Sequence, residues 1–292
     1  MDINEITSHM SNFSLAKLYL RKQIEEISKD KEKKPIDSEK LEKIFKEKFS
    51  FTNFKTSNVK HLTFYYYNSE SINDFSWGCS WRTIQIILSY LLSIKGDLNK
   101  KDISFKTLFL KYGERTKLIN LFKKDNGIKD NKIPNYLNKP FCPFETIDGL
   151  ADPFISKLIL LDFGFRGELL LINDYPNNSY APKEVFNLTI NFEEFVHLLE
   201  EHFNDENPTP IIINDTTVNL IICGIKTNDD CVYFIILDPH IKINDNGENG
   251  IYYIKLNKDG VYDKNENIQP NILGVRLHFK EKNWIVFVPE NL

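Results

Sequence analysis

Apolar residues at helical spacing mark one segment of the chain as a buried helix. The positions that follow the i, i+3, i+4 pattern are Ile84, Ile87, Leu88, Leu91 and Leu92. Further apolar residues fall between them, which predicts a central helix that is buried on most of its sides. A loop that contains Gly78 leads into this helix, and Cys79 stands where its first turn is expected. We therefore expect a thiol at a helix N-terminus, where unpaired amides and the helix dipole favour the thiolate.

Short apolar runs separated by turn residues dominate the last third of the chain. The predicted strands are Thr209–Asn214, Val218–Ile225, Val232–Asp238, Ile251–Leu256, Val275–Phe279 and Trp284–Pro289. The polar turn Thr227 to Asp230 predicts that the second and third of them form an antiparallel hairpin. Helices first and a meandering sheet later predict the α+β class, with the cysteine helix packed on an antiparallel sheet.

The first 55 residues differ from the rest of the chain. Two helical segments, the second at Ser38–Phe49, flank the charged run Lys29–Lys34, so we predict a helical extension over 1–55 and a main domain over 56–292. The other predicted elements are strands at His61–Tyr67 and Glu168–Ile172, helices at Phe105–Tyr112, Lys117–Lys124, Asp152–Phe163 and Asn191–Phe203, and an irregular stretch at Asp125–Pro143.

The composition of the chain argues against several classes of function. The net charge of −4 over 292 residues gives the protein no overall positive electrostatic field that would attract nucleic acid. The four cysteines form no CxxC pair, so we expect no metal and no cofactor. The longest nearly apolar run, Ile84 to Ile94, is too short to span a bilayer. We expect a monomer in the cytoplasm, with recruitment to the endoplasmic reticulum by a partner left open.

One histidine stands in a setting unlike the other five. His240 follows a strongly apolar run that ends in Asp238 and Pro239. Residues two apart in an extended chain project on the same side, and a carboxylate directly after an apolar run is costly unless it is paired. An imidazolium is a suitable partner. The alternative, a strand-ending Asp-Pro turn beside an incidental histidine, stays open at this point, as does a purely structural role for Cys79.

Together these residues form a set for nucleophilic catalysis. Cys79 would be the nucleophile, His240 the base that takes the thiol proton, and Asp238 the carboxylate that orients the imidazole. Tyr67, at the end of an aromatic run, would donate to the oxyanion together with the Cys79 backbone amide.

Two ordered blocks of the sequence resemble a known family. The segment from Trp77 to Gln85 is similar to the Trp-Gly-Cys-x-aromatic-Arg-x-x-Gln block of the ubiquitin-fold-modifier-specific cysteine proteases, and Leu237 to His240 matches their Leu-Asp-Pro-His block. The resemblance implies a papain-like catalytic domain that cleaves after the C-terminal glycine of the ubiquitin-fold modifier. It implies precursor maturation, deconjugation or both, with Cys79, Asp238 and His240 as the triad and Tyr67 as the oxyanion donor.

The match to the family pattern is less complete at the expected substrate contacts than at the triad. The resemblance implies contacts at Trp77, Gly78, Trp81, Asn214 and Asp215. The chain departs from the family pattern in three places: Ser76 replaces a glycine, Asn214 and Asp215 replace a glycine pair, and Ile241 replaces a tyrosine. These changes leave the triad intact and bear on the groove and the identity of the modifier.

Two alternative functions stay open, and a third is disfavoured. Ubiquitin-cleaving relatives of the same family, which would make ubiquitin the partner, take their histidine from the strand before the Asp, where this chain has Thr217 to Leu220. Autophagy proteases share Trp-Gly-Cys and Asp-Pro-His with this chain but usually carry an aliphatic residue where it has Trp81, which argues against that assignment. The second open alternative is a catalytically silent module that binds a modifier tail.

Overall fold

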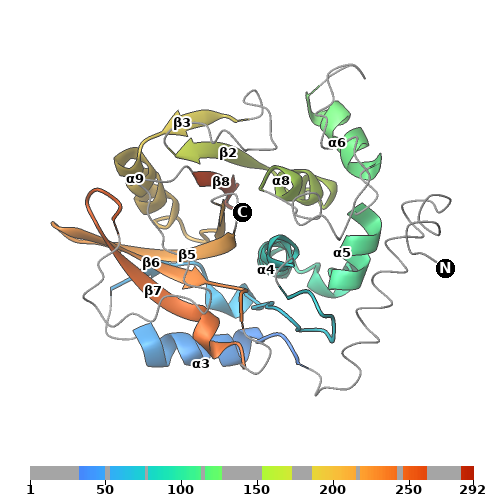
Figure 1. Cartoon of the computed structure of the whole chain (residues 1–292), viewed down its shortest axis with the longest axis horizontal. Coiled ribbons are helices and arrows are strands. Elements are labelled where there is room, and N and C mark those ends of the chain that lie inside the picture. The colour runs from blue at the N-terminus through green and yellow to red at the C-terminus, as the bar shows by residue number, and fades with distance from the viewer. Residues whose placement is uncertain are drawn as a thin grey trace, which may run out of the picture.

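The computed structural model describes residues 33–49, 53–75, 78–112, 116–126, 153–172, 186–214, 218–241, 246–261 and 284–292. Within these ranges the protein has a mixed α+β fold in which helices flank a central sheet (Figure 1). The predicted helix before residue 30, the strand at 275–279 and residues 127–143 of the predicted irregular stretch lie outside the described residues. The first two residues of that stretch, Asp125 and Asn126, are instead the last two of a helix at Thr116–Asn126.

The sheet is mostly antiparallel. Its strands follow the order β3 (Leu188–Ile190), β2 (Gly167–Ile172), β8 (Trp284–Pro289), β4 (Ile211–Asn214), β5 (Asn219–Thr227), β6 (Cys231–Leu237) and β7 (Ile251–Asn257), and β1 (Lys55–Thr56) pairs with β5. Among the described strands, β2 and β3 form the parallel pair, and the other pairs are antiparallel. The predicted hairpin of β5 and β6 is confirmed, and β6 ends at Leu237, one residue before the predicted end at Asp238.

Both faces of the sheet are buried, and the strands alternate between two apolar clusters. In β8, Ile285 and Phe287 join the cluster that contains the cysteine helix, whereas Trp284 and Val286 join the cluster on the opposite face. Alternation of this kind follows from the two-residue period of a strand. It is why the strands read as continuous apolar runs instead of alternating with polar residues.

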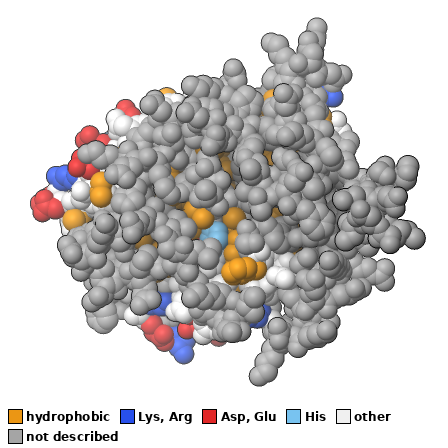
Figure 2. All heavy atoms as spheres, viewed as in Figure 1, with side chains coloured by type: hydrophobic (Ala, Val, Ile, Leu, Met, Phe, Trp, Pro, Cys, Tyr) orange, Lys and Arg blue, Asp and Glu red, His pale blue; other side chains and the backbone are white. Residues whose placement is uncertain are grey.

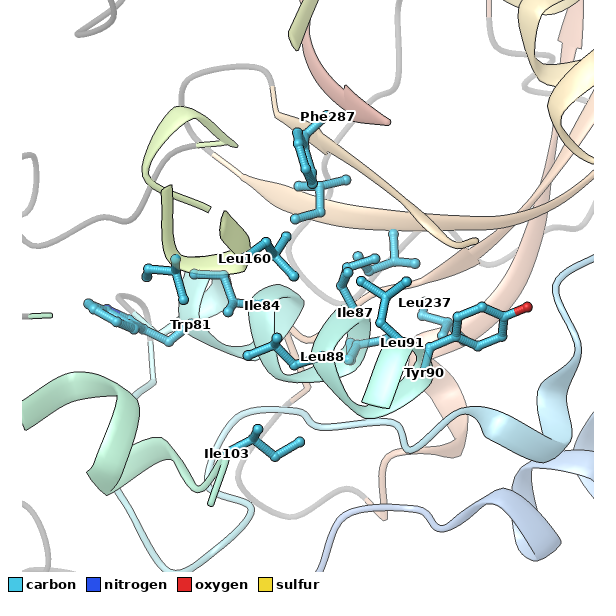
Figure 3. Packing of buried hydrophobic residues seen from close by; sticks show 14 of the residues in the cluster. Trp81, Ile84, Ile87, Leu88, Tyr90, Leu91, Ile103, Leu160, Leu237 and Phe287 are labelled. Carbon is cyan, nitrogen blue, oxygen red and sulfur yellow. The ribbon is translucent and has the colours of Figure 1, made fainter. Parts of the chain in front are cut away.

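The cysteine helix, α4 (Cys79–Ile94), lies at the centre of the molecule (Figure 1). It is buried at every position from Cys79 to Leu92, which confirms the prediction of a central helix. In Figure 3, Ile87 and Leu91 point toward the sheet, while Ile103 lies on the side of α4 away from Phe287. Three other helices lie on the same face of the sheet as α4: α5 (Phe105–Tyr112), α6 (Thr116–Asn126) and α8 (Pro153–Asp162).

Two further helices complete the arrangement. On the opposite face, α9 (Phe192–His202) begins with a capping box between Asn191 and Glu194. The predicted helix α3 (Ser38–Phe49) buries Leu41, Ile44, Phe45 and Phe49 in the same cluster as α4. The domain boundary near residue 55 stays a prediction.

Short 3₁₀ turns lie at Val59–His61, Leu98–Lys100 and Glu248–Gly250. None of the helices in the described ranges is both long and apolar enough to cross a membrane.

The predicted strand at His61–Tyr67 is wrong. In this stretch the backbone pairing with a neighbouring segment that a strand requires is limited to one β-bridge, between Phe64 and Ile36. The neighbouring amides donate elsewhere: Thr63 N to Ser89 Oγ at 3.1 Å, and Tyr67 N to the carbonyl of Pro239 at 3.0 Å. The aromatic side chains are buried as they would be in a strand, but the adjacent helix offers a side-chain acceptor instead of a backbone ladder.

The packing of α4 on the sheet predicts a large stability effect at Leu91, which is 0% exposed. Leu91→Ala should lower the free energy of unfolding by about 2–5 kcal/mol, because it removes buried methyl groups and leaves a cavity. Urea unfolding measures this change. Leu188→Ala is the matched control, since Leu188 is 55% exposed and its loss should cost less than about 0.5 kcal/mol. Equal effects of the two substitutions would contradict the central position of α4.

Candidate active site

Cys79 is the first residue of α4, and Gly78 is its N-cap. The cap has no side-chain hydrogen bond, and the carbonyl of Gly78 accepts the Arg82 amide at 3.0 Å. The thiol therefore lies at the positive end of a sixteen-residue helix, next to amides that lack intrahelical acceptors. The sequence correctly predicted this helix start.

Asp238 and His240 form a closed pair directly after β6. Oδ1 of Asp238 accepts the His240 Nδ1–H at 2.6 Å and the His240 backbone N–H at 2.9 Å. Oδ2 accepts the hydroxyl of Tyr252, on β7, at 3.0 Å. Asp238 is 1% exposed and His240 is 3% exposed. Because Asp238 occupies Nδ1, the imidazole has Nε2 free for another partner.

That partner is Cys79. Burial alone would raise the pKa of the thiol, but the hydrogen bond and charge of His240 outweigh it and lower the pKa of Cys79 to about 7. Burial alone would lower the pKa of the imidazole, but Asp238 and then Cys79 raise the pKa of His240 to about 10. Between these values the thiolate–imidazolium pair is the favoured state. The structure thus brings the three predicted residues together.

Tyr67 completes the cluster. Its ring meets the His240 ring edge to face at a centroid distance of 5.2 Å. Its hydroxyl is buried, and its interaction with Cys79 lowers the pKa of the thiol. Burial, and then the negative charge of Cys79, raise the pKa of Tyr67 well above its ordinary value. The phenol therefore stays protonated and remains a hydrogen-bond donor beside the sulfur.

A buried arginine holds the loop that joins Tyr67 to Cys79. Nε of Arg82 donates to Asp74 at 2.7 Å, Nη1 to Glu70 at 2.6 Å and to Gln85 at 2.9 Å, and Nη2 to the carbonyl of Ser69 at 2.7 Å. Each of the three guanidinium nitrogens therefore has an acceptor, as a fully buried cation requires.

The same loop contains strained backbone. Asn68, Glu70 and Ser71 have φ values of 62°, 62° and 55°, in the left-handed region that non-glycine residues seldom adopt. Oδ1 of Asp74 accepts the Asn68 amide at 2.7 Å, so the carboxylate that pairs with the arginine also fixes the first of these residues. Gly78 is required for a related reason, since a Cβ at this position would overlap the carboxylate of Asp74.

The remaining predicted contact residues lie in varied settings. Trp81 is fully buried against the rings of Phe105 and Phe109, at centroid distances of 6.4 and 5.6 Å. Asn214 is buried, and its Nδ2 donates to the carbonyl of Val218 at 3.0 Å. Trp77 and Asp215 lie outside the described residues. Substrate contact by Trp77, Gly78, Trp81, Asn214 and Asp215 stays a prediction.

Other histidines have partners away from this cluster. His61 contacts Ser93, and His202 contacts the carbonyl of Thr209. His197 is exposed on α9 beside Glu201. Figure 2 shows hydrophobic side chains and a histidine near the centre of the viewed face, with described charged side chains toward its margins.

Sequence reasoning missed two residues of the cluster. Tyr252 reaches Asp238 from the next strand, and its position opposite Ile236 became known only with the register of β6 and β7. Asn219 places Nδ2 3.9 Å from the sulfur of Cys79. A polar residue at the start of an apolar strand was the available signal. Among the described residues, no group of His, Cys, Asp or Glu side chains could hold a metal ion.

In combination, the fold and the cluster define an α+β protein with a buried Cys–His–Asp constellation. No family model matches the sequence, and no curated protein matches it. The solved structures that it resembles include the crystal structure of UfSP from C. elegans, at 15% sequence identity and a TM-score of 0.43. That similarity covers 85% of this chain and 36% of the other. The chain thus spans little more than a third of that protein, and the likeness is too low to assign a family.

The arginine network predicts a specific loss of stability. Arg82→Met leaves two carboxylates without their cation, and it should lower the free energy of unfolding by about 3–5 kcal/mol. Arg166→Met is the control, because Arg166 is exposed and its replacement should change stability by less than about 0.5 kcal/mol. Chemical unfolding measures both variants. An Arg82→Met protein as stable as the control would show that the network does not hold the loop.

The ion pair predicts an unusual pH profile for alkylation of Cys79. The reactive thiolate forms as the pH rises through the thiol pKa, so Cys79 should react with iodoacetamide with a midpoint near pH 7. In His240→Ala the midpoint should move upward, because the imidazolium that lowers the pKa is lost. Rates at Cys79 and Cys231, followed by mass spectrometry from pH 5 to 10, measure this. A midpoint that stays in place in His240→Ala would contradict the pairing.

Proposed function

We propose that the protein is a cysteine-type peptidase in which Cys79 is the nucleophile, His240 the proton carrier and Asp238 the orienting carboxylate. The observation that carries this proposal is the hydrogen bond of 2.6 Å between His240 Nδ1 and Asp238, which leaves the other ring nitrogen to the Cys79 thiol. A structural cysteine has no need of a buried imidazole and carboxylate, both of which are expensive to bury.

The reaction would proceed in two stages. The Cys79 thiolate attacks the carbonyl carbon of the scissile amide, and the carbonyl electron pair moves to oxygen. The His240 imidazolium then gives its proton to the leaving amine as the C–N bond breaks, which leaves a thioester on Cys79. In the second stage, neutral His240 takes a proton from water, which attacks the thioester. The C–S bond breaks, the thiolate returns and the acid product leaves.

The oxyanion of each tetrahedral intermediate needs donors. We assign this role to the Tyr67 hydroxyl and the backbone amide of Cys79. The position of the Tyr67 hydroxyl beside the Cys79 sulfur and its raised pKa support the assignment, because a phenol that stays protonated can donate to an oxyanion that forms next to that sulfur. The start of α4 supplies the second donor.

For the substrate, we propose the ubiquitin-fold modifier, cleaved after its C-terminal glycine. Support comes from the resemblance of the Trp77–Gln85 and Leu237–His240 blocks to the proteases of that modifier. In the structure, Gly78, Arg82 and Gln85 of the first block hold the loop before Cys79, so these three residues support the placement of the nucleophile and not the choice of substrate.

Activity-based labelling tests the proposal. The ubiquitin-fold modifier and ubiquitin, each with an electrophile after the C-terminal glycine, are incubated separately with the protein. The modifier probe should form a covalent adduct at Cys79, and His240→Ala should slow its formation about 10²-fold or more. His197→Ala is the control, because this exposed histidine lies on α9 and should leave the rate unchanged. Intact mass and peptide mapping report the adduct.

The outcomes separate the candidate functions. Labelling by ubiquitin alone would overturn the assignment of the modifier and favour a deubiquitinase. If neither probe reacts, and Cys79→Ser binds both proteins as the wild type does, the protein is a silent binding module.

A further inference from the structure

Asn219 lies against the nucleophile from the side of the sheet. It is the first residue of β5 and is 1% exposed. Its Nδ2 lies 2.6 Å from Oγ of Ser80 and 3.9 Å from Sγ of Cys79. His240 and Tyr67 reach the same sulfur from other parts of the chain. Asn219 is therefore a further polar side chain in contact with the proposed reacting atom.

The surroundings of this amide are incompletely paired. Oδ1 of Asn219 is buried and has no hydrogen-bond partner among the described residues. Native proteins pair most buried polar groups, so an unpaired amide oxygen beside a thiol requires an explanation. If Asn219 served only to hold β5, a buried apolar residue would do so without leaving an acceptor unpaired.

The charges that face the sulfur leave a role for a neutral donor. His240 carries a positive charge and is hydrogen-bonded to Asp238. Tyr67 presents a neutral hydroxyl, and the negative charge of Asp74 helps to raise its pKa. Asn219 has no proton to lose, so its N–H groups can donate to the sulfur at every pH. The backbone N–H of Asn219 also acts on Cys79 and, after the effects of burial and His240, lowers the pKa of the thiol.

We propose that Asn219 is a further catalytic residue, whose side-chain amide donates to the Cys79 thiolate. The proposal rests on the proposed function of Cys79 as nucleophile. It assigns Asn219 a task at two points: the amide stabilises the resting thiolate, and it stabilises the same anion when the C–S bond of the thioester breaks and the electron pair returns to sulfur.

Substitutions at position 219 test the proposal through the pH profile of Cys79 alkylation by iodoacetamide. Asn219→Ala should raise the midpoint by about 0.5–1 pH unit, because the donor to the thiolate is lost. At pH 6 the rate should fall about 3- to 10-fold, while at pH 9.5 it should match the wild type. Asn219→Asp keeps the size of the side chain but adds a negative charge, so it should raise the midpoint further.

Ser80→Ala separates a direct role from a structural one. Oγ of Ser80 accepts a hydrogen bond from Nδ2 of Asn219. Without this hydroxyl, the sulfur of Cys79 is the acceptor that remains for the Asn219 side-chain amide. The Cys79 midpoint should then stay in place or fall, whereas a scaffold role that runs through Ser80 would raise it as Asn219→Ala does. Asn187→Ala is the control, because the Asn187 side chain accepts a backbone amide at the β2 edge and should leave the midpoint unchanged.

The results distinguish the two proposals. A wild-type midpoint near that of an ordinary thiol would overturn the ion pair itself. A low wild-type midpoint with Asn219→Ala and Asn219→Asp unchanged would overturn the role of Asn219 and leave the nucleophile in place. If Asn219→Ala does not fold, as circular dichroism would show, the near-isosteric Asn219→Asp decides: a raised midpoint supports the role, and an unchanged one rejects it.

Discussion

The buried ion pair between Arg82 and Asp74 is the interaction on which the geometry around Cys79 depends. A guanidinium and a carboxylate are both costly to remove from water, and the pair is favourable only if the other hydrogen-bonding groups of both residues are satisfied. They are: Arg82 also bonds Glu70, Gln85 and the loop backbone, and the second oxygen of Asp74 accepts an amide of the same loop. This network offsets the cost of the left-handed backbone at Asn68, Glu70 and Ser71.

A second link fixes that loop relative to the strand end. The carbonyl of Pro239, between the two residues of the Asp–His pair, accepts the amide of Tyr67. The phenol, the thiol and the imidazole thus belong to segments that are joined by short backbone contacts. Because Cys79 and His240 are buried, the thiolate and imidazolium charges strongly stabilise each other, and either residue alone would favour its neutral form. The thiolate and the imidazolium therefore form together, and the loss of either one destabilises the other.

Much of this arrangement could be predicted from the sequence where periodicity decides structure. The helix that begins at Cys79 and the strand that ends before Asp238 both follow from apolar spacing, and two residues of separation explain why Asp238 and His240 meet. The segment before Tyr67 could not be predicted in this way, because its aromatic pattern suits a strand while its amides donate to scattered acceptors, such as Ser89 Oγ and the carbonyl of Pro239, and not to one neighbouring strand. Tyr252 and Asn219 were missed since they reach the cluster through strand register, which a single sequence does not show.

The block that surrounds the cysteine has a physical explanation beyond the thiol itself. Gly78 leaves room for the carboxylate of Asp74, Arg82 binds that carboxylate, and Gln85 bonds both Glu70 and the carbonyl of Ile103. None of these residues needs to touch a substrate, yet each fixes the path of the loop between Tyr67 and the nucleophile. The proposed role of Tyr67 as oxyanion donor requires that its phenol be held to within a fraction of an ångström of its working position. The spacing Gly-Cys-x-x-Arg-x-x-Gln meets this demand because, on a helix, it places the arginine and the glutamine one turn apart on the side that faces the loop.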